Sequence, residues 1–383
     1  MAPPQFRGAR PERGADVMKI LLRVDASVEM GSGHVMRCLT LADSLRARGG
    51  RCTFICRTHR GHLADFIRDR GHEVRLLPEG REAGSDQVLA HADWLGASRA
   101  EDVVASVAIA RETRPDWLIA DHYALDEAWE RAMRPHVGRI MVVDDLADRR
   151  HDCDLLLDQN LGRTARDYQG LVPDGATVLV GTAHALLRPE FVLNRPRSLA
   201  RRSEAHPRTV LISLGGADKD NYTRRTLELI GASDLCGDAV MTVVLGAGSP
   251  WIDDISSLAR SLSCRTDVLI QSDRMAELMA DADVAVGGAG ATTWERACLG
   301  VPSALWVMAD NQRAIAAAME DSGAAMVLDP AAAGGKMSML ERLNSFFQDG
   351  PALASMSRRA AAIVDGLGVN RVLQSLSLNE QRS

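Results

Sequence analysis

The sequence lacks several patterns that define well-known protein classes. Its seven cysteines form no CxxC pair and are odd in number, which argues against a disulfide framework or a structural zinc site. No apolar run approaches roughly 18 residues, so we expect no membrane span and no stable membrane association. No long basic run occurs and the net charge is −6, which argues against nucleic acid as the main partner. We expect a cytoplasmic protein.

Several catalytic motifs are also missing. No G-x-S-x-G sequence is present, which disfavours a covalent acyl enzyme. There is neither a Walker A lysine nor the full G-x-G-x-x-G spacing of a dinucleotide site. The stretch 144–158 holds six aspartates and His151, but their spacing matches neither an EF-hand nor a zincin. We therefore expect no metal and no cofactor.

What the chain does contain is a regular alternation of short β-branched runs and helical patterns. Such alternation predicts βαβ units, parallel sheets and an α/β fold. The expected strands are 19–25, 52–56, 73–77, 117–121, 140–144, 154–157, 177–180, 209–214, 240–245, 267–270, 283–286, 304–307 and 325–328. The expected helices are 34–48, 62–70, 99–113, 125–134, 222–230, 254–262, 273–280, 292–299, 311–321, 338–347 and 351–365.

The length of 383 residues suggests two domains. We expect a disordered extension over 1–17 and a first Rossmann-like domain over 18–190. A linker rich in proline and arginine follows over 191–207, and the second Rossmann-like domain with C-terminal helices takes up 208–383. A cleft between two such domains is the default ligand site.

The first candidate motif lies between the first strand and the first helix. Gly31 and Gly33 permit a sharp turn, and His34 comes where the helix begins. Ligands of open α/β sheets bind beyond the carboxyl ends of the strands, and imidazole is suited to proton transfer near neutral pH. His34 is therefore a candidate base, and the alternative is a histidine that caps or packs the helix start.

A second candidate motif follows the strand at 283–286. Glycines at 287, 288 and 290 precede a helix that starts near Ala291, and helix starts of this kind bind anions. Glu295, one turn further on, is placed to accept hydrogen bonds from ribose hydroxyls. Asp310, Asn311 and Gln312 follow the next strand; they either contact sugar or phosphate oxygens or cap a helix, and both roles remain open.

Acidic residues end two strands of the first half. Asp121, followed by His122 and Tyr123, either orients a base, binds sugar hydroxyls or caps a turn. For Asp144 and Asp145 we favour turn capping.

Together these residues resemble a known family. The stretches are Arg23–Ser27, Gly31–Arg37, Leu214–Asp218, Gly287–Glu295 and Asp310–Gln312. They are similar to the UDP-2,4-diacetamido-2,4,6-trideoxy-β-L-altropyranose hydrolases of pseudaminic acid biosynthesis. The likeness covers roughly residues 18–330. The C-terminal glycine loop is shared more widely with MurG-type GT-B glycosyltransferases.

The resemblance implies a two-domain GT-B fold and a metal-independent, inverting hydrolysis that releases UDP. It implies that His34 is the catalytic base, on the sugar side, and that the second domain binds UDP. The expected substrate-binding residues are Asp25, Gly33, Arg37, Tyr123, Gly215, Gly216, Gly288, Ala289, Thr292, Glu295, Asn311 and Gln312. The segment 79–100 looks like an addition that reshapes the sugar pocket. We expect a monomer or weak dimer.

Two alternatives stay open. A glycosyltransferase of the same fold would pass the sugar from a UDP-sugar to an acceptor hydroxyl instead of water. A non-catalytic protein would bind the nucleotide sugar without turnover, and a histidine opposite the phosphate loop argues against it.

Overall fold

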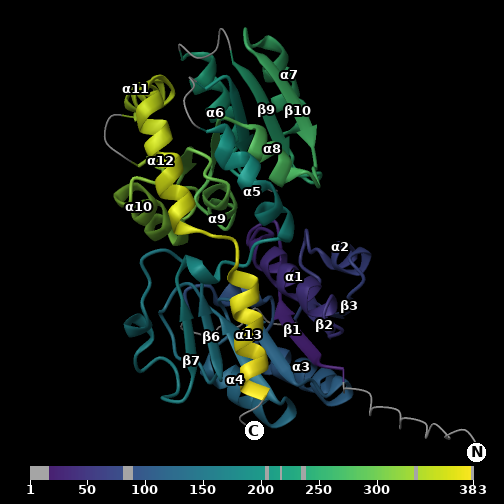
Figure 1. Cartoon of the computed structure of the whole chain (residues 1–383). Helices are drawn as coiled ribbons and strands as arrows, with labels where there is room; N and C mark the ends of the chain where they lie inside the picture. Colours follow the sequence, from purple (N-terminus) through teal and green to yellow (C-terminus); the bar gives the residue numbers. More distant parts are fainter. Residues whose placement is uncertain are drawn as a thin grey trace, which may run out of the picture.

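The computed structural model describes residues 17–80, 89–202, 207–215, 218–233, 239–331 and 335–380. Within them the chain forms two parallel sheets, one above the other in Figure 1, each with helices packed against it. The sheets are built from consecutive halves of the chain, as the alternating pattern predicts. Each sheet belongs to one unit, and we call these the first and the second unit.

The first sheet has seven strands in the order β3-β2-β1-β4-β5-β6-β7. Its strands are β1 (Lys19–Val24), β2 (Arg51–Arg57), β3 (Glu73–Leu77), β4 (Trp117–Asp121), β5 (Arg139–Val143), β6 (Leu155–Asp158) and β7 (Thr177–Val180). Strand β1 is buried on both faces: Ile20, Leu22 and Val24 enter one core cluster and Leu21 another. This explains why Ile20, Leu21 and Leu22 are apolar in succession, although the strand also contains the buried Arg23.

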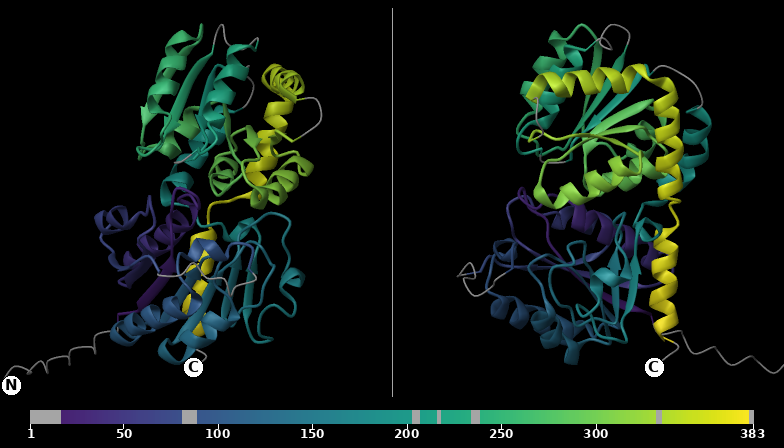
Figure 2. Two further views of the ribbon diagram at one scale, coloured as in Figure 1. Left: turned by 180° about the vertical axis from the view of Figure 1, so that it is seen from behind. Right: turned by 90° about the vertical axis from the view of Figure 1, so that its left-hand side faces the viewer.

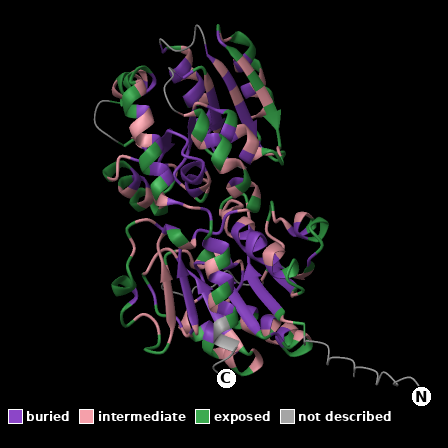
Figure 3. Cartoon of the chain, viewed as in Figure 1, coloured by how far each residue is buried: buried purple, intermediate pink, exposed green. Residues whose placement is uncertain are grey.

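The second sheet has six strands in the order β10-β9-β8-β11-β12-β13. They are β8 (Thr209–Ser213), β9 (Val240–Leu245), β10 (Arg265–Ile270), β11 (Val284–Gly288), β12 (Ser303–Trp306) and β13 (Met326–Leu328). In both sheets every predicted strand is present, with ends that differ by at most two residues. In Figure 3 the buried residues follow most of these strands, whereas the edge strands β7 and β10 contain none.

The helices lie between and beyond the strands. They are α1 (Gly33–Arg46), α2 (Ala64–Asp69), α3 (Arg99–Thr113), α4 (Glu127–Met133), α5 (Pro189–Arg201), α6 (Tyr222–Gly231), α7 (Ile252–Ser261), α8 (Met275–Asp281), α9 (Thr292–Cys298), α10 (Arg313–Asp321), α11 (Gly335–Gln348), α12 (Gly350–Ile363) and α13 (Gly368–Glu380). Short 3₁₀ turns include η1 (Ala92–Leu95) and η6 (Asp310–Gln312). None of the described helices is long and apolar enough to cross a membrane.

Most of the predicted linker is helical. Helix α5 begins at Pro189, a position that tolerates proline because the first helical N–H has no partner in any case. Phe191 is fully buried, and Arg195 donates to the carbonyl oxygens of Ala361 and Val364 at 2.7 and 2.9 Å. The residues expected to link the domains therefore pack on the second unit. Residues 203–206 lie outside the described part.

The last helix, α13, returns to the first unit. Figure 2 shows α12 beside the second sheet and α13 beside the first. Val369, Val372, Leu373 and Leu376 join the core cluster that contains Ile20 and Leu22. Their spacing of three, one and three residues places them on one helix face. The second domain predicted over 208–383 therefore does not match the packing, because its last helix, α13, packs on the first sheet.

The cysteines differ in state. Cys38, Cys52, Cys56, Cys153 and Cys298 are buried free thiols. Cys264 is disulfide-bonded, although the number and spacing of the cysteines argued against a disulfide framework.

Candidate active site

The turn after β1 positions His34. Ser27 Oγ accepts hydrogen bonds from the backbone N–H groups of Glu29 and Met30, at 3.1 and 3.0 Å. Gly31 has a φ of +75°, a conformation that other residues rarely adopt. Helix α1 then begins at Gly33, so His34 lies in its first turn with 11% of its side chain exposed.

The carboxylate of Asp121 lies beside His34. In the sheet register Asp121 is paired with Val24, so both residues end their strands at the carboxyl edge. Oδ1 of Asp121 lies 2.6 Å from Nδ1 of His34. Burial opposes ionisation of Asp121, but Arg37 and His34 outweigh it and hold its pKa well below the usual value. An ionised carboxylate accepts the proton of Nδ1, which leaves Nε2 as an acceptor.

Arg37, one turn along α1, binds the same carboxylate. Its Nε and Nη2 atoms donate to Oδ2 and Oδ1 of Asp121, both at 2.6 Å, and Nη1 donates to Asp145 at 2.8 Å. The side chain is 6% exposed. We expected Arg37 to bind substrate, but in the structure its guanidinium is already held by two carboxylates.

The neighbouring residues Asp144 and Asp145 have different roles. Asp144 accepts the backbone N–H of Ala147 at 2.9 Å and an Arg149 N–H at 2.8 Å, as the turn-capping interpretation predicts. Asp145 instead binds Arg37 and is 14% exposed. The turn-capping interpretation is therefore wrong for Asp145, because its side chain points to the helix that carries His34.

Tyr123 is brought to His34, but its ring is covered. The two ring centroids lie 4.7 Å apart in an edge-on arrangement, and Tyr123 is only 5% exposed. Burial, together with the carboxylate of Asp145, raises the pKa of the Tyr123 hydroxyl well above its usual value. The rings that cover it, His91 and Trp94, come from the segment 79–100, and no sequence motif pointed to them.

Asp25 is part of a buried network behind the site. Its side chain has no exposed surface and forms an ion pair with Arg23 at 2.8 Å. It also accepts the backbone N–H of Arg57 at 2.6 Å, and Nε2 of His122 lies 3.3 Å away. We expected Asp25 to bind substrate, but its side chain is fully buried and can act on a ligand only through the residues that it contacts. His122 accepts the Ala124 N–H on Nδ1, so Nε2 carries the proton toward Asp25.

The carboxyl edge of the first sheet approaches the second unit. A Cβ atom placed on Gly162 would lie 4.0 Å from Cβ of Ala318, in α10. Arg163, next along the chain, donates to the carbonyl oxygens of Asp145 and Leu146 at 3.3 and 2.9 Å. Figure 1 shows the turn before α1 at the edge of the first unit that faces the second. The loops around His34 therefore lie on the side of the second unit.

The glycine loop of the second unit follows β11. A Cβ on Gly288 would lie 2.9 Å from Sδ of Met308, so any other residue at this position would displace the Met308 side chain. Ala289 is fully buried and donates its N–H to the carbonyl of Trp306 at 3.0 Å. Thr292 begins α9, and its hydroxyl accepts from Arg296 at 3.1 Å. The N–H of Ala289 is thus already used within the sheet.

Glu295 and Gln312 lie near this loop. The Glu295 side chain is 18% exposed, with Arg188 at 3.8 Å, and burial raises its pKa to about 6. Oε1 of Gln312 accepts the Met308 N–H at 3.1 Å, and its amide nitrogen would be 3.6 Å from a Cβ on Gly290. Gln312 therefore lies beside the glycine loop.

Asn311 and Gly215 are exposed, and Gly215 has a φ of +91°. Gly216 lies outside the described residues. Asp310 binds the side chain of Arg313 at 3.0 Å, and neither η6 nor α10 has a side-chain cap. The capping alternative for Asp310 and Asn311 is therefore wrong.

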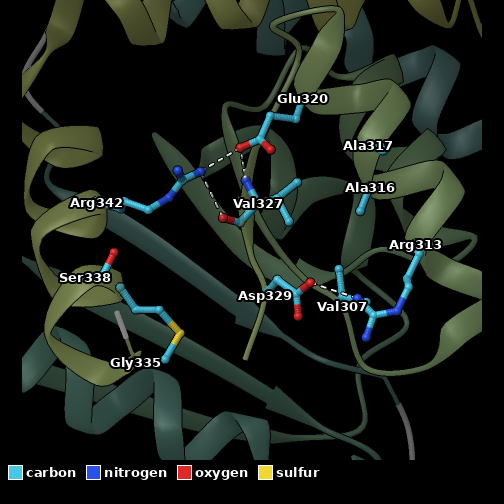
Figure 4. A pocket seen from close by; sticks show the side chains of 11 residues that line it. Val307, Arg313, Ala316, Ala317, Glu320, Val327, Asp329, Gly335, Ser338 and Arg342 are labelled. Carbon is cyan, nitrogen blue, oxygen red and sulfur yellow. Dashed lines mark hydrogen bonds and ion pairs between the residues drawn. The ribbon is translucent and has the colours of Figure 1, made fainter. Parts of the chain in front are cut away.

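A cavity of about 440 Å³ lies in the second unit, between α10, β13 and α11 (Figure 4). Its charged side chains are paired with one another: Arg313 with Asp329 at 2.8 Å, and Arg342 with Glu320 at 2.6 Å. None of the predicted site residues lines it. We therefore do not assign the site to this cavity.

Comparison with known proteins gives matches to both parts of the chain. Residues 232–367 match the glycosyltransferase family 28 C-terminal domain. A UDP-2,4-diacetamido-2,4,6-trideoxy-β-L-altropyranose hydrolase of Campylobacter jejuni is 26% identical over 263 residues, which is 68% of this chain and 81% of that protein. An uncharacterized protein of Methanocaldococcus jannaschii is 25% identical over 300 residues, 77% of this chain. The match spans only 57% of that second protein's length.

Solved structures show the same architecture. MurG of Acinetobacter baumannii has a TM-score of 0.64 and is 15% identical, with 94% of this chain and 99% of that chain covered. The predicted α/β fold with two Rossmann-like units is confirmed. The chain resembles the hydrolases named above, it has the GT-B fold, and its second unit matches the C-terminal domain of glycosyltransferase family 28.

Proposed function

We propose that this protein hydrolyses a UDP-linked diacetamido-trideoxyhexose at the anomeric C–O bond, releasing UDP and the free sugar for pseudaminic acid biosynthesis. The observation that carries the proposal is the pair formed by His34 and Asp121, 2.6 Å apart at the carboxyl edge of the first sheet. The similarity to the Campylobacter jejuni hydrolase supports the same reaction.

In the proposed mechanism His34 is the general base. Its Nδ1–H is held by Asp121, so Nε2 accepts a proton from a water molecule as that water attacks the anomeric carbon. General-base catalysis of this kind contributes about 10²–10⁴-fold in rate. Since water enters opposite the leaving group, the configuration at the anomeric carbon is inverted.

The second unit binds UDP in this proposal. Charge grows on the pyrophosphate as the C–O bond breaks, and backbone N–H groups near Gly215 and Thr292 stabilise it without a metal. Glu295 accepts hydrogen bonds from the ribose, and Asn311 and Gln312 contact the pyrophosphate or the sugar. Gln312 supports this arrangement because it lies beside Gly290.

Incubation with a panel of UDP-linked diacetamido-trideoxyhexoses tests the function, with UDP release followed by NMR. The reaction is run in ¹⁸O-water without any acceptor. We expect ¹⁸O in the sugar, because water attacks carbon. Label in UDP would mean attack at phosphorus and would overturn the mechanism.

A second candidate is a glycosyltransferase that uses a UDP-sugar donor. The match of residues 232–367 to the glycosyltransferase family 28 C-terminal domain favours it, because that domain includes Thr292, Glu295 and Gln312 of the proposed nucleotide site. The two candidates differ in one measurement: a transferase releases UDP only when an acceptor is present.

A further inference from the structure

Three aromatic rings form a contiguous group with the ring of the proposed base. Tyr123 lies at its centre, with the ring centroids of His34, His91 and Trp94 at 4.7, 5.2 and 5.6 Å. The Trp94 ring is stacked on Tyr123 with an angle of 26° between the planes. His91 also contacts Trp94, at 4.5 Å.

The rings are arranged in two layers. Tyr123 is 5% exposed, whereas His91 and Trp94 are both partly exposed. His91 and Trp94 therefore cover Tyr123 and form the partly exposed layer of this group, on the ring that neighbours His34. Burial lowers the pKa of His91, so its ring is neutral at pH 7 and the outer surface carries no charge from it.

The turn that carries these rings is fixed on its C-terminal side. Leu95 is fully buried, and the carbonyl of Gly96 accepts the N–H of Gly80 at 2.8 Å. Gly96 has a φ of +65°, and a Cβ there would lie 2.5 Å from the ring of His59. Ser98 starts α3 with a capping box that uses Glu101. These contacts hold the backbone that follows Trp94, and the Trp94 ring itself stacks on Tyr123, the neighbour of His34.

We propose that Trp94 determines sugar specificity: its ring packs against an apolar face of the sugar while His34 faces the anomeric carbon. The inference rests on the proposed function, since it concerns the sugar side of the same site. An aromatic face gains from contact with C–H groups and offers no hydrogen-bond partner to a hydroxyl. It therefore selects a sugar with a methyl group at C6 over one with a hydroxymethyl group.

Binding measurements in a His34→Asn background test this without turnover. Calorimetry compares UDP, a UDP-linked 6-deoxy diacetamidohexose and its 6-hydroxy counterpart. We expect Trp94→Ala to raise the Kd of the 6-deoxy sugar about tenfold or more and to leave the Kd of UDP unchanged, because one apolar contact discriminates roughly 10–200-fold. Trp94→Phe keeps an aromatic face and should restore most of the affinity. Asp93→Ala, an exposed change in the same turn, is the control.

The proposal is overturned if Trp94→Ala binds the 6-deoxy sugar as tightly as its parent does, or if it weakens UDP and both sugars equally. Its failure is distinct from failure of the proposed function. If the proposed function is wrong, the protein with His34 intact releases no UDP. The affinities of the Trp94 variants test the sugar contact whether or not UDP is released.

Discussion

Arg37 binds Asp121 through two parallel hydrogen bonds of 2.6 Å, and the same carboxylate orients His34. Burial opposes ionisation of this carboxylate, but Arg37 and His34 outweigh it and hold its pKa well below the usual value, so Asp121 is ionised at neutral pH. The orientation of His34 therefore depends on a charge pair one helical turn away.

Replacing Asp121 by Asn should damage both stability and turnover. The amide cannot accept from His34 and Arg37 as the carboxylate does, and it leaves Arg37 with Asp145 as its remaining counter-charge. Removal of one partner from a buried pair costs about 3–5 kcal/mol, and we expect the lower end. Urea unfolding and kcat measure the two effects. Asp116→Asn, at the other end of the strand, should keep wild-type kcat.

His34→Asn should lower kcat by about 10²–10⁴-fold and change KM little, because the imidazole acts on water in the transition state. The comparison is with His136→Asn, which lies in the turn before β5, away from the carboxyl edge. Steady-state UDP release gives both constants. Wild-type turnover in the His34 variant would remove this residue from the mechanism.

Much of this fold could be predicted because parallel strands are buried on both faces and so form apolar runs. The sheet against which α13 packs could not be predicted. The spacing of Val372 and Leu376 shows which helix face is buried but not which sheet buries it. The predicted linker was wrong in structure because α5 runs through Pro196, so a proline in this stretch does not mark a loop.

The candidate site was predicted where it depends on strand ends. His34 follows β1 and Asp121 ends the adjacent strand β4, so their proximity is a consequence of the strand order in the sheet. Asp144 and Asp145 are adjacent in sequence, but their side chains bind different partners. The sequence alone does not show which of the two caps the turn. Trp94 comes from a segment without a motif, and its contact with Tyr123 depends on the path of that segment.

Binding of a UDP-sugar should weaken as the pH falls through about 6. Burial raises the pKa of Glu295 to about 6, so the free protein protonates this acceptor below that value. If the ionised form binds ribose, the Kd rises by up to roughly tenfold per pH unit below the pKa. Glu295→Gln should bind with no such dependence between about pH 5 and 7.5, and Glu277→Gln, in α8, should behave as wild type. An unchanged wild-type Kd over this range would contradict a ribose contact by Glu295.

Leu373→Ala tests whether α13 stabilises the first unit although it follows the second unit in sequence. Leu373 is 2% exposed within the core cluster that contains β1, and a buried Leu→Ala change costs about 2–5 kcal/mol. Leu367→Ala, at a residue 44% exposed, should change stability by no more than about 0.5 kcal/mol. Hydrogen exchange locates the effect: we expect faster exchange at the amides of β1 and β4 and little change at β11. Acceleration confined to the strands of the second unit would contradict this, because it would mean that α13 stabilises the sheet nearest to it in sequence.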